Sequence, residues 1–392
     1  METLPPEIIT KILEYLPFGD RRVVAMVNKA FYYASYHPAF SRKEFLTYQT
    51  SEVDLKKFND FKKMLMNSRR KLLCLKFIDF IFIDDLTIFT NLGNHIISLH
   101  FNNLKCLNDS FLDAISQYCR NLEKLELVRL QDLSITDKNR APIYKLCSIT
   151  LDDVQISDRE FNPILKFAPN LRDLSIVNCN INGSSQVLKR FYPQRTDSAI
   201  NCIFTSLTSL DCSLDANLRS IVFSENLTSL RIRNGHNLSV SFLQQILTNI
   251  PNVKHLHIDR CCIIDDSNFV DLPISNLKEL ITLKILGSRI SHLSLRHIWN
   301  STLKVITFDS VSLLPLRVEP FQENLLAVGQ TILLLGIRVP LLTQLEIYID
   351  SHSFSFIEGE NLLSHYWEEI NELVKRCFKE MKIFRLWKTR RL

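Results

Sequence analysis

The chain has 392 residues, of which 46% are hydrophobic and 23% charged, and its formal net charge at pH 7 is +5. This apolar fraction is typical of a folded protein and excludes disorder as the main state. So small a net charge on so long a chain gives no support to a nucleic-acid-binding or membrane-surface protein. The eight glycines are widely separated, so no glycine-rich phosphate-binding loop can be drawn, which argues against dinucleotide-binding and P-loop enzymes.

Residues 1–48 predict a small module of three helices. Pro5 and Pro6 preset the backbone at the start of the first helix, which carries apolar residues at helical spacing: Ile8, Ile9, Ile12, Leu13 and Leu16. A turn at residues 17–20 leads to a second helix, for which we expect Asp20 to be the N-cap. The apolar residues of this second helix are Val23, Val24, Val27 and Phe31. A third helix is expected after Pro38, with Phe40, Phe45 and Leu46. Such a module encloses little core, so apolar side chains remain for a partner or for the adjoining array.

Residues 49–71 predict a helical linker. One apolar stripe runs through the segment 54–70, and lysines occupy the opposite face; the stripe consists of Leu55, Phe58, Phe61 and Leu65. A basic amphipathic helix can also bind a membrane surface, but we favour a packed helix that joins two modules.

A repeat of the form apolar-x-x-apolar-x-apolar covers most of the remaining chain. Successive copies are mostly 20–29 residues apart, as in leucine-rich repeats. They begin at Leu72, Ile96, Leu122, Leu146, Leu171, Leu207, Leu227, Val253, Leu280, Leu303 and Leu342. Helical segments are expected between them, among others at 110–119, 159–168 and 240–250. The two longest intervals predict insertions at 183–204 and 313–339.

One strand and one helix per repeat predict an α/β fold. Because a helix is about twice as wide as the spacing between strands, the units should stack into a curved solenoid, with parallel strands on the concave face and helices on the convex face. A helix from Asn361 to Cys377 could cap this array, and a last strand is expected at Phe378, Met381 and Ile383.

The N-terminal residues resemble an F-box. The resemblance is carried by Leu4-Pro5-x-Glu7-Ile8-Ile9-x-x-Ile12-Leu13-x-x-Leu16, followed by Asp20, Val27, Lys29 and Phe31. Arg21 stands where the family usually has leucine. Together with the repeats, the chain is similar to F-box/leucine-rich-repeat proteins, with an F-box at 1–48, a helical linker at 49–71 and a solenoid with a C-terminal capping helix at 72–392.

The resemblance implies a non-catalytic substrate-recognition subunit of a Skp–cullin–F-box ubiquitin ligase. Its partners would be the Skp adaptor, through it a cullin, and a protein substrate; the chain would be a monomer within this hetero-complex, without a cofactor and without nucleic acid or membrane as a partner. The residues carried over for adaptor contact are Leu4, Pro5, Ile8, Ile9, Ile12, Leu13, Leu16, Val27 and Phe31. A scaffold without a ligase role is the alternative: its N-terminal helices would cap the solenoid, and Leu4, Pro5, Ile8 and Ile12 would be buried against Leu72 and Leu75.

Residues between the ladder positions should point outward from the concave sheet. There we expect a basic block at Arg231, Arg233, His255, His257 and Lys284, near Asp211 and Tyr348. An acidic or phosphorylated substrate segment could bind this block, since guanidinium groups bind phosphate bidentately. A solvated face with interspersed charges is the alternative.

Other chemistry has weak support. The cluster His255, His257, Cys261 and Cys262 is the densest set of metal-ligand types, but Cys261 should point into the core, so four zinc ligands do not converge. The N-terminus lacks the basic start and apolar run of a signal peptide. We therefore expect a cytoplasmic or nuclear protein with reduced cysteines.

Overall fold

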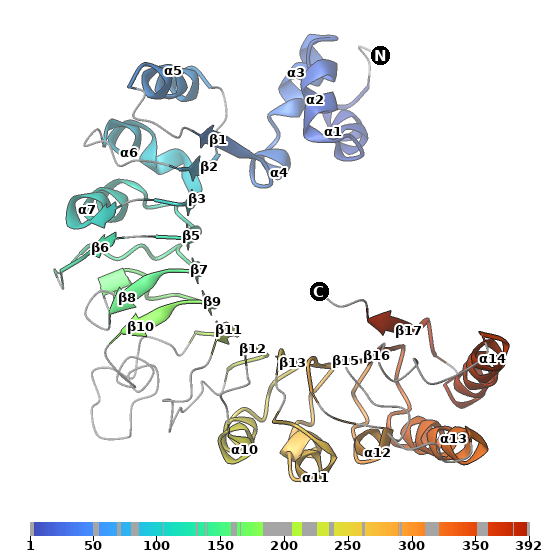
Figure 1. Cartoon of the computed structure of the whole chain (residues 1–392). Helices are drawn as coiled ribbons and strands as arrows, with labels where there is room; N and C mark the ends of the chain where they lie inside the picture. The colour runs from blue at the N-terminus through green and yellow to red at the C-terminus, as the bar shows by residue number, and fades with distance from the viewer. Residues whose placement is uncertain are drawn as a thin grey trace. The chain divides into compact units, whose positions relative to one another are not determined.

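The computed structural model describes residues 4–49, 55–68, 72–79, 86–104, 106–130, 132–136, 138, 140–157, 163–164, 166–182, 206–213, 226–234, 239–260, 263–288, 290, 292–309, 321–350, 360–378 and 380–389. It divides into two compact units, Met1–Gly183 and Ser184–Leu392, which are described one at a time. Each unit is built on parallel strands with helices along one side of the sheet (Figure 1). No helix of the described residues is long and apolar enough to cross a bilayer.

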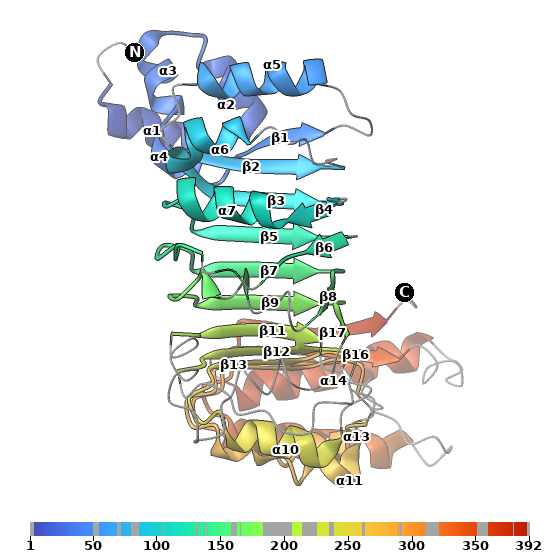
Figure 2. The ribbon, with the colours of Figure 1, turned by 90° about the vertical axis from the view of Figure 1, so that its left-hand side faces the viewer.

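The first unit begins with four short helices and continues as a strand ladder. The helices are α1 (Pro6–Glu14), α2 (Phe18–Val24), α3 (Lys29–Ser35) and α4 (Pro38–Ser41). The ladder is β1 (Phe45–Gln49), β2 (Leu73–Ile78), β3 (Ile96–Asn102), β5 (Lys124–Val128), β7 (Ser148–Asp152) and β9 (Asp173–Val177), all parallel (Figure 2). On the helical side lie α5 (Leu55–Met66), α6 (Thr87–Leu92) and α7 (Asp109–Tyr118). Short strands form two further pairs, β4 (Cys106–Asn108) with β6 (Asp132–Ser134) and β8 (Gln155–Ser157) with β10 (Asn180–Asn182).

The second unit repeats the same plan. Its strands are β11 (Ser209–Ser213), β12 (Ser229–Arg233), β13 (His255–Ile258), β14 (Thr282–Ile285), β15 (Val305–Asp309), β16 (Gln344–Asp350) and β17 (Ile383–Thr389). Its helices are α10 (Val240–Thr248), α11 (Asp266–Phe269), α12 (His292–Leu295), α13 (Phe321–Arg338) and α14 (Glu360–Cys377).

The apolar ladder predicted by the repeat forms the core of both units. In the first, Leu75, Leu99 and Leu125 stand in register and are at most 1% exposed; Ile149 and Leu174 continue the row. In the second, the corresponding row is Leu210, Leu230, Leu256, Leu283, Ile306 and Leu345. No repeat could bury these side chains alone, so neighbouring repeats stabilise one another. The structure confirms the leucine-rich-repeat class.

A left-handed turn follows most of the ladder strands. The turn residues have φ between 52° and 66°: Asp79, Asn103, Arg129, Asp153, Asn178, Asn234, Arg260 and Gly287. Gly287 is required by space as well, because a Cβ atom there would lie 2.9 Å from the Cα of Arg260. These turns send the chain from the sheet toward the helical side at the same point of each repeat.

Three predictions for the N-terminal module are wrong. The expected single second helix is two helices: α2 ends at Val24, and Asn28, in an extended conformation, caps α3, since its side chain accepts a hydrogen bond from the Phe31 N–H at 3.0 Å. Asp20 lies inside the first turn of α2, which Pro17 precedes. Phe45 and Leu46 lie in strand β1 and not in a helix, and β1 is the first strand of the ladder, with Leu46 in register with Leu75.

The end of the array also differs from expectation in register. A last strand is present, but Phe384 pairs with Leu345 and Leu386 with Ile347, so the repeat pattern is Met381-x-x-Phe384-x-Leu386, three residues later than predicted. Part of the expected insertion at 313–339 is helix α13. The predicted insertion at 183–204 lies outside the described residues, as do Cys261, Cys262 and half of the predicted helix at 159–168. The predicted module boundaries at residues 48 and 71 stay predictions.

Candidate functional site

The N-terminal helices have a small buried core of their own. It is formed by Ile9, Leu13, Phe31, Ala34 and Phe40, none more than 8% exposed. Leu16 is partly buried against this core. Ile9, Leu13 and Phe31 therefore hold the module together, although sequence reasoning also proposed them for partner contact.

The other predicted contact residues lie on the surface. Ile8 is 47% exposed, Ile12 42% and Leu4 36%, and Pro5 is exposed beside them. Helix α1 is thus apolar on two sides, with Ile9 and Leu13 facing inward and Ile8 and Ile12 facing solvent. Val27, between α2 and α3, is 61% exposed.

Four more large apolar side chains of the same helices are exposed, and sequence reasoning did not select them. Tyr15 is 87% exposed, Met26 78%, Tyr33 62% and Val23 59%. Tyr15 could have been found, because it extends the Ile8–Ile12 row by one turn of the helix. Together with Leu4, Pro5, Ile8, Ile12 and Val27 they form what we call the exposed apolar face. So many exposed apolar side chains on so small a module are typical of a protein-interaction site.

Arg21 ties the helices together from inside. Its guanidinium is bound to Glu44 through Nε and Nη2, at 3.1 and 2.6 Å from Oε1, and the two side chains are only 14% and 8% exposed. Nη1 donates to the carbonyls of Leu13, at 3.4 Å, and Leu16, which lie at and just beyond the C-terminal end of α1. The guanidinium also lies 4.8 Å from the ring centre of Phe40. The arginine that departs from the family pattern is therefore a structural element that connects α1, α2 and the start of β1.

The helices are joined to the repeats through β1 and not through α1. Tyr48 of β1 is 2% exposed and packs among Phe58, Phe61 and Phe77, with ring centres 5.3–6.4 Å apart. This aromatic cluster and strand β1 cover the first repeat, so no side chain of α1 is needed as a cap. The exposure of Ile8 and Ile12 is expected if the helices form an interaction module. A cap of the solenoid would require these two side chains to be buried.

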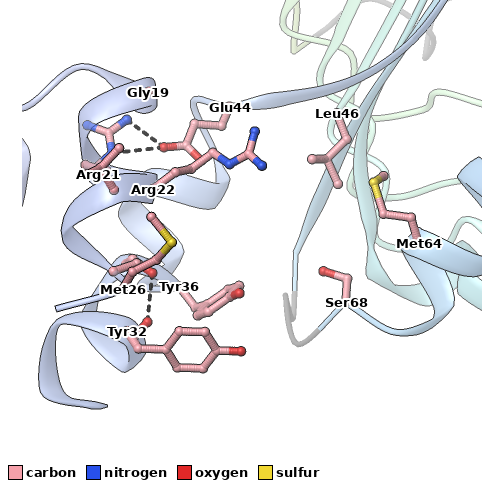
Figure 3. Close-up of a pocket in the computed structure, with 13 residues that line it drawn as sticks. Gly19, Arg21, Arg22, Met26, Tyr32, Tyr36, Glu44, Leu46, Met64 and Ser68 are labelled. Carbon is pink, nitrogen blue, oxygen red and sulfur yellow. Dashed lines mark hydrogen bonds and ion pairs between the residues drawn. The ribbon is translucent and has the colours of Figure 1, made fainter. Parts of the chain in front are cut away.

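A cleft of about 760 Å³ opens next to the exposed apolar face. Met26, Tyr32 and Tyr36 line it on the α2–α3 side, and Leu46, Met64 and Ser68 lie across from them (Figure 3). The Arg21–Glu44 pair closes one end (Figure 3). Val23 and Met26 belong to both the cleft and the exposed apolar face, so a partner bound to that face can extend into the cleft.

The second candidate site is the sheet face opposite the helices, which we call the open sheet face. In the second unit it carries the predicted basic residues, but carboxylates neutralise most of them. Arg233 binds Asp211 through two contacts of 2.7 Å. Arg231 binds Asp259 at 3.1 and 2.8 Å, and His257 lies 2.7 Å from the other Asp259 oxygen.

Asp259 shows how strongly these groups interact. Burial by itself would raise the pKa of its carboxyl group, but hydrogen bonds from His257 and Arg231 and their charges outweigh burial and lower the pKa to about 2. The sequence pattern alone gives no sign that Asp259 pairs with Arg231. His255 contacts the Thr282 hydroxyl at 3.1 Å, and Lys284 is half-buried in the same row as His257. The side chain of Tyr348 lies outside the described residues.

On the open sheet face of the first unit, a basic side chain is likewise paired with a carboxylate. His100 Nδ1 contacts the Glu126 carboxylate, and Phe45 packs edge-on against the imidazole ring, with centroids 6.2 Å apart. Hydrogen bonding to His100 lowers the pKa of Glu126, against the opposing effect of burial. Among the described residues, no group of three His, Cys, Asp or Glu side chains could hold a metal ion.

Comparisons with known proteins agree with the N-terminal assignment. A family model of the F-box domain matches residues 1–43. No curated protein matches the chain. Solved structures similar to this chain include an internalin from Listeria monocytogenes, which is 14% identical. The aligned region covers 90% of this chain and 95% of the internalin chain, with a TM-score of 0.33. That likeness is too distant to bear on function. The chain therefore carries an F-box domain, and the strand ladder of its own structure is similar to that of leucine-rich-repeat proteins.

Proposed function

We propose that this chain is the substrate-recognition subunit of a Skp–cullin–F-box ubiquitin ligase. In this proposal the exposed apolar face of the F-box binds the Skp adaptor, and the repeats bind a protein substrate. The chain does no chemistry itself, and it acts by holding the substrate near the ubiquitin-charged enzyme. The proposal places the protein in the cytoplasm or nucleus.

The observation that carries the proposal is the exposure of Ile8 and Ile12 within a segment that matches the F-box family. Both residues lie on α1, whose inward side already packs the core of the module, so their outward position has no structural role in the chain alone. Burying an isoleucine side chain in an interface is worth about 1.5–3 kcal/mol. Two of them therefore supply a large part of the affinity of a nanomolar complex.

The substrate surface belongs to the same proposal, but the geometry changes what it would bind. Because Arg231 and Arg233 are paired with carboxylates, a phosphorylated segment would have to displace Asp259 and Asp211. Within the predicted basic block, which the structure describes in full, Lys284 and His255 are the two members for which no carboxylate partner is found. We therefore favour a substrate that binds the open sheet face through mixed polar contacts rather than through a phosphate group.

Adaptor binding is tested with the purified full-length chain against the Skp adaptor by biolayer interferometry. We expect Ile8→Asp/Ile12→Asp to weaken binding at least 100-fold, corresponding to the loss of about 3 kcal/mol or more. Because both residues are exposed, the double variant should keep the circular dichroism spectrum and melting temperature of the wild type. Tyr144→Asp is the matched control, since Tyr144 is an exposed aromatic residue of the same unit, 66% exposed and outside the F-box; it should bind like the wild type.

Two outcomes would contradict the proposal. A folded wild-type chain that does not bind the adaptor would favour an interaction scaffold without a ligase role. Undiminished binding by the double variant would show that the adaptor contacts another surface. Loss of binding by Tyr144→Asp as well would indicate an effect not confined to the F-box.

A further inference from the structure

One edge of the second unit carries an apolar patch, and basic residues lie on the same loops and helix ends. The patch lies at the edge of the sheet where the strands begin. Helices α12 and α13 end at this edge, and the loops that follow them lead into strands β15 and β16. We call it the strand-entry rim. Its large apolar side chains are unusually exposed: Ile337 76%, Trp299 67%, Leu341 45% and Leu334 37%. Neither the F-box nor the open sheet face includes these residues.

The patch is held rigidly by the residues around it. Asn300 is 5% exposed; its side-chain amide donates to the Leu277 carbonyl at 2.8 Å, and its backbone N–H donates to the Arg338 carbonyl at 3.3 Å. These bonds fix Trp299, the preceding residue, beside the end of α13. Arg338 lies over the Trp299 ring at 5.8 Å and donates to the Arg296 carbonyl. An exposed tryptophan fixed in this way loses little conformational entropy when a partner covers it.

Basic side chains lie on the same loops and helix ends as the patch. The exposed or half-buried cations nearest to it along the chain are Lys278, Arg296, Lys304 and Arg338. Glu279, the acidic residue among them, pairs with Lys254 at 3.5 Å. These positive charges also act on His297. Burial and the charges of Arg296 and Arg338 lower the pKa of its imidazole, against the opposing charge of Asp266. A bound segment would therefore meet an electropositive border around an apolar centre.

We propose that the strand-entry rim binds an acidic amphipathic segment of a partner protein. Apolar side chains of the segment would cover Trp299 and Ile337, and its carboxylates would pair with Arg296 and Lys304. Tryptophan, arginine and large aliphatic residues are the types that dominate binding energy in protein interfaces. The aliphatic centre distinguishes this surface from a nucleic-acid site, where stacking aromatics and phosphate contacts lie together along a groove. The proposal does not depend on the F-box function.

The test uses the full-length chain and a phage-displayed library of random 16-residue peptides. We expect the enriched peptides to combine Leu, Ile, Phe or Trp at helical spacing with Asp and Glu. The tightest synthetic peptide should lose at least about tenfold in affinity against Trp299→Ala or Ile337→Ala. It should lose a similar factor against Arg296→Glu/Lys304→Glu, and a peptide with Lys in place of its acidic residues should regain binding to that charge-reversed variant.

Two variants of the same unit serve as controls. Val270→Ala removes another half-exposed apolar side chain, and Lys284→Glu reverses a charge on the open sheet face. Neither should change the affinity. The proposal is overturned if no peptide is enriched, if the enriched peptides are basic, or if Lys284→Glu rather than Trp299→Ala abolishes binding. It is also overturned if Trp299→Ala abolishes a concentration-dependent dimer in sedimentation, or the binding of a fluorescein-labelled single-stranded RNA, because the patch would then serve a second copy or a nucleic acid.

Discussion

Replacing Arg21 by alanine should loosen the F-box helices by about 3–5 kcal/mol, the usual cost of removing one partner of a buried ion pair. The Glu44 carboxylate, whose side chain is 8% exposed, would be left without the two guanidinium contacts that compensate its burial. The carbonyls of Leu13 and Leu16 would lose a donor at the end of α1 as well. The double variant Arg21→Leu/Glu44→Leu removes both charges together. It should therefore lose several kcal/mol less stability than the losses of Arg21→Leu and Glu44→Leu added together.

Hydrogen exchange followed by mass spectrometry measures this effect locally, which matters because a chain with two units need not unfold in one step. Amides of α1 and α2 should exchange roughly 100-fold faster or more in Arg21→Ala, whereas amides of β5 and β7 should be unaffected. Arg22→Ala is the matched control, because it removes the neighbouring arginine and leaves the ion pair intact. Acceleration of less than fivefold in α1, or equal acceleration in Arg22→Ala, would refute the structural role of Arg21.

Three further predictions concern the fold. Arg140, whose side chain is 3% exposed, binds Asp109 and Asp113, so Arg140→Leu should cost about 3 kcal/mol in urea unfolding followed by circular dichroism. Burial would raise the pKa of the Asp109 carboxyl group, but hydrogen bonds from Thr136, Lys138 and Arg140 hold this pKa well below its usual range. The ionised Asp109 therefore contributes its full stabilisation above about pH 4 and loses it as the pH falls further. The stability of Arg140→Leu should accordingly differ less from that of the wild type at pH 3 than at pH 7. Gly287→Ala should lower the stability by about 1–3 kcal/mol, measured in the same way, because φ is +66° and Arg260 Cα lies close; a change below 0.5 kcal/mol would show that the turn adapts. Tyr48→Ala should cost about 3–5 kcal/mol and reduce the near-ultraviolet dichroism of the aromatic cluster, whereas an unchanged spectrum would contradict the packing described for it.

The repeat could be predicted from the sequence because its physical requirement is strict. A ladder position must be apolar in every repeat, since a polar side chain there would be buried on all sides, and eleven copies of one spacing leave little room for another fold. Strand β1 was missed for the same reason. Leu46 and Tyr48 occupy the last two ladder positions, but Lys43 stands at the first, so the three-position pattern is incomplete. Only the pairing of β1 with β2 reveals it.

The candidate site was less predictable, because sequence patterns do not separate contact residues from core residues. Helix α1 is apolar on two sides, and nothing in its spacing shows that Ile9 and Leu13 are the buried pair and Ile8 and Ile12 the exposed one. Charge pairing is hidden in the same way. Arg231 and Asp259 are 28 residues apart, and they meet only because Arg231 on β12 lies in register with His257 on β13, two residues before Asp259.

The connection between the F-box and the first repeat bears directly on the proposed mechanism. Only residues 42–44 separate the end of α4 from the start of β1, and the first and last of them are engaged. Arg42 binds Glu123 at 2.7 Å, and its carbonyl accepts a hydrogen bond from the Cys74 thiol at 3.6 Å; Glu44 binds Arg21. The exposed Arg42–Glu123 pair contributes little free energy, so the buried Arg21–Glu44 pair and the aromatic cluster at Tyr48 are the main restraints. A module that acts by proximity needs such restraints, because a flexible joint would lower the effective concentration of a bound substrate near the enzyme. Arg21→Ala should therefore slow substrate ubiquitination even if adaptor binding is retained, whereas Ile8→Asp/Ile12→Asp should abolish both.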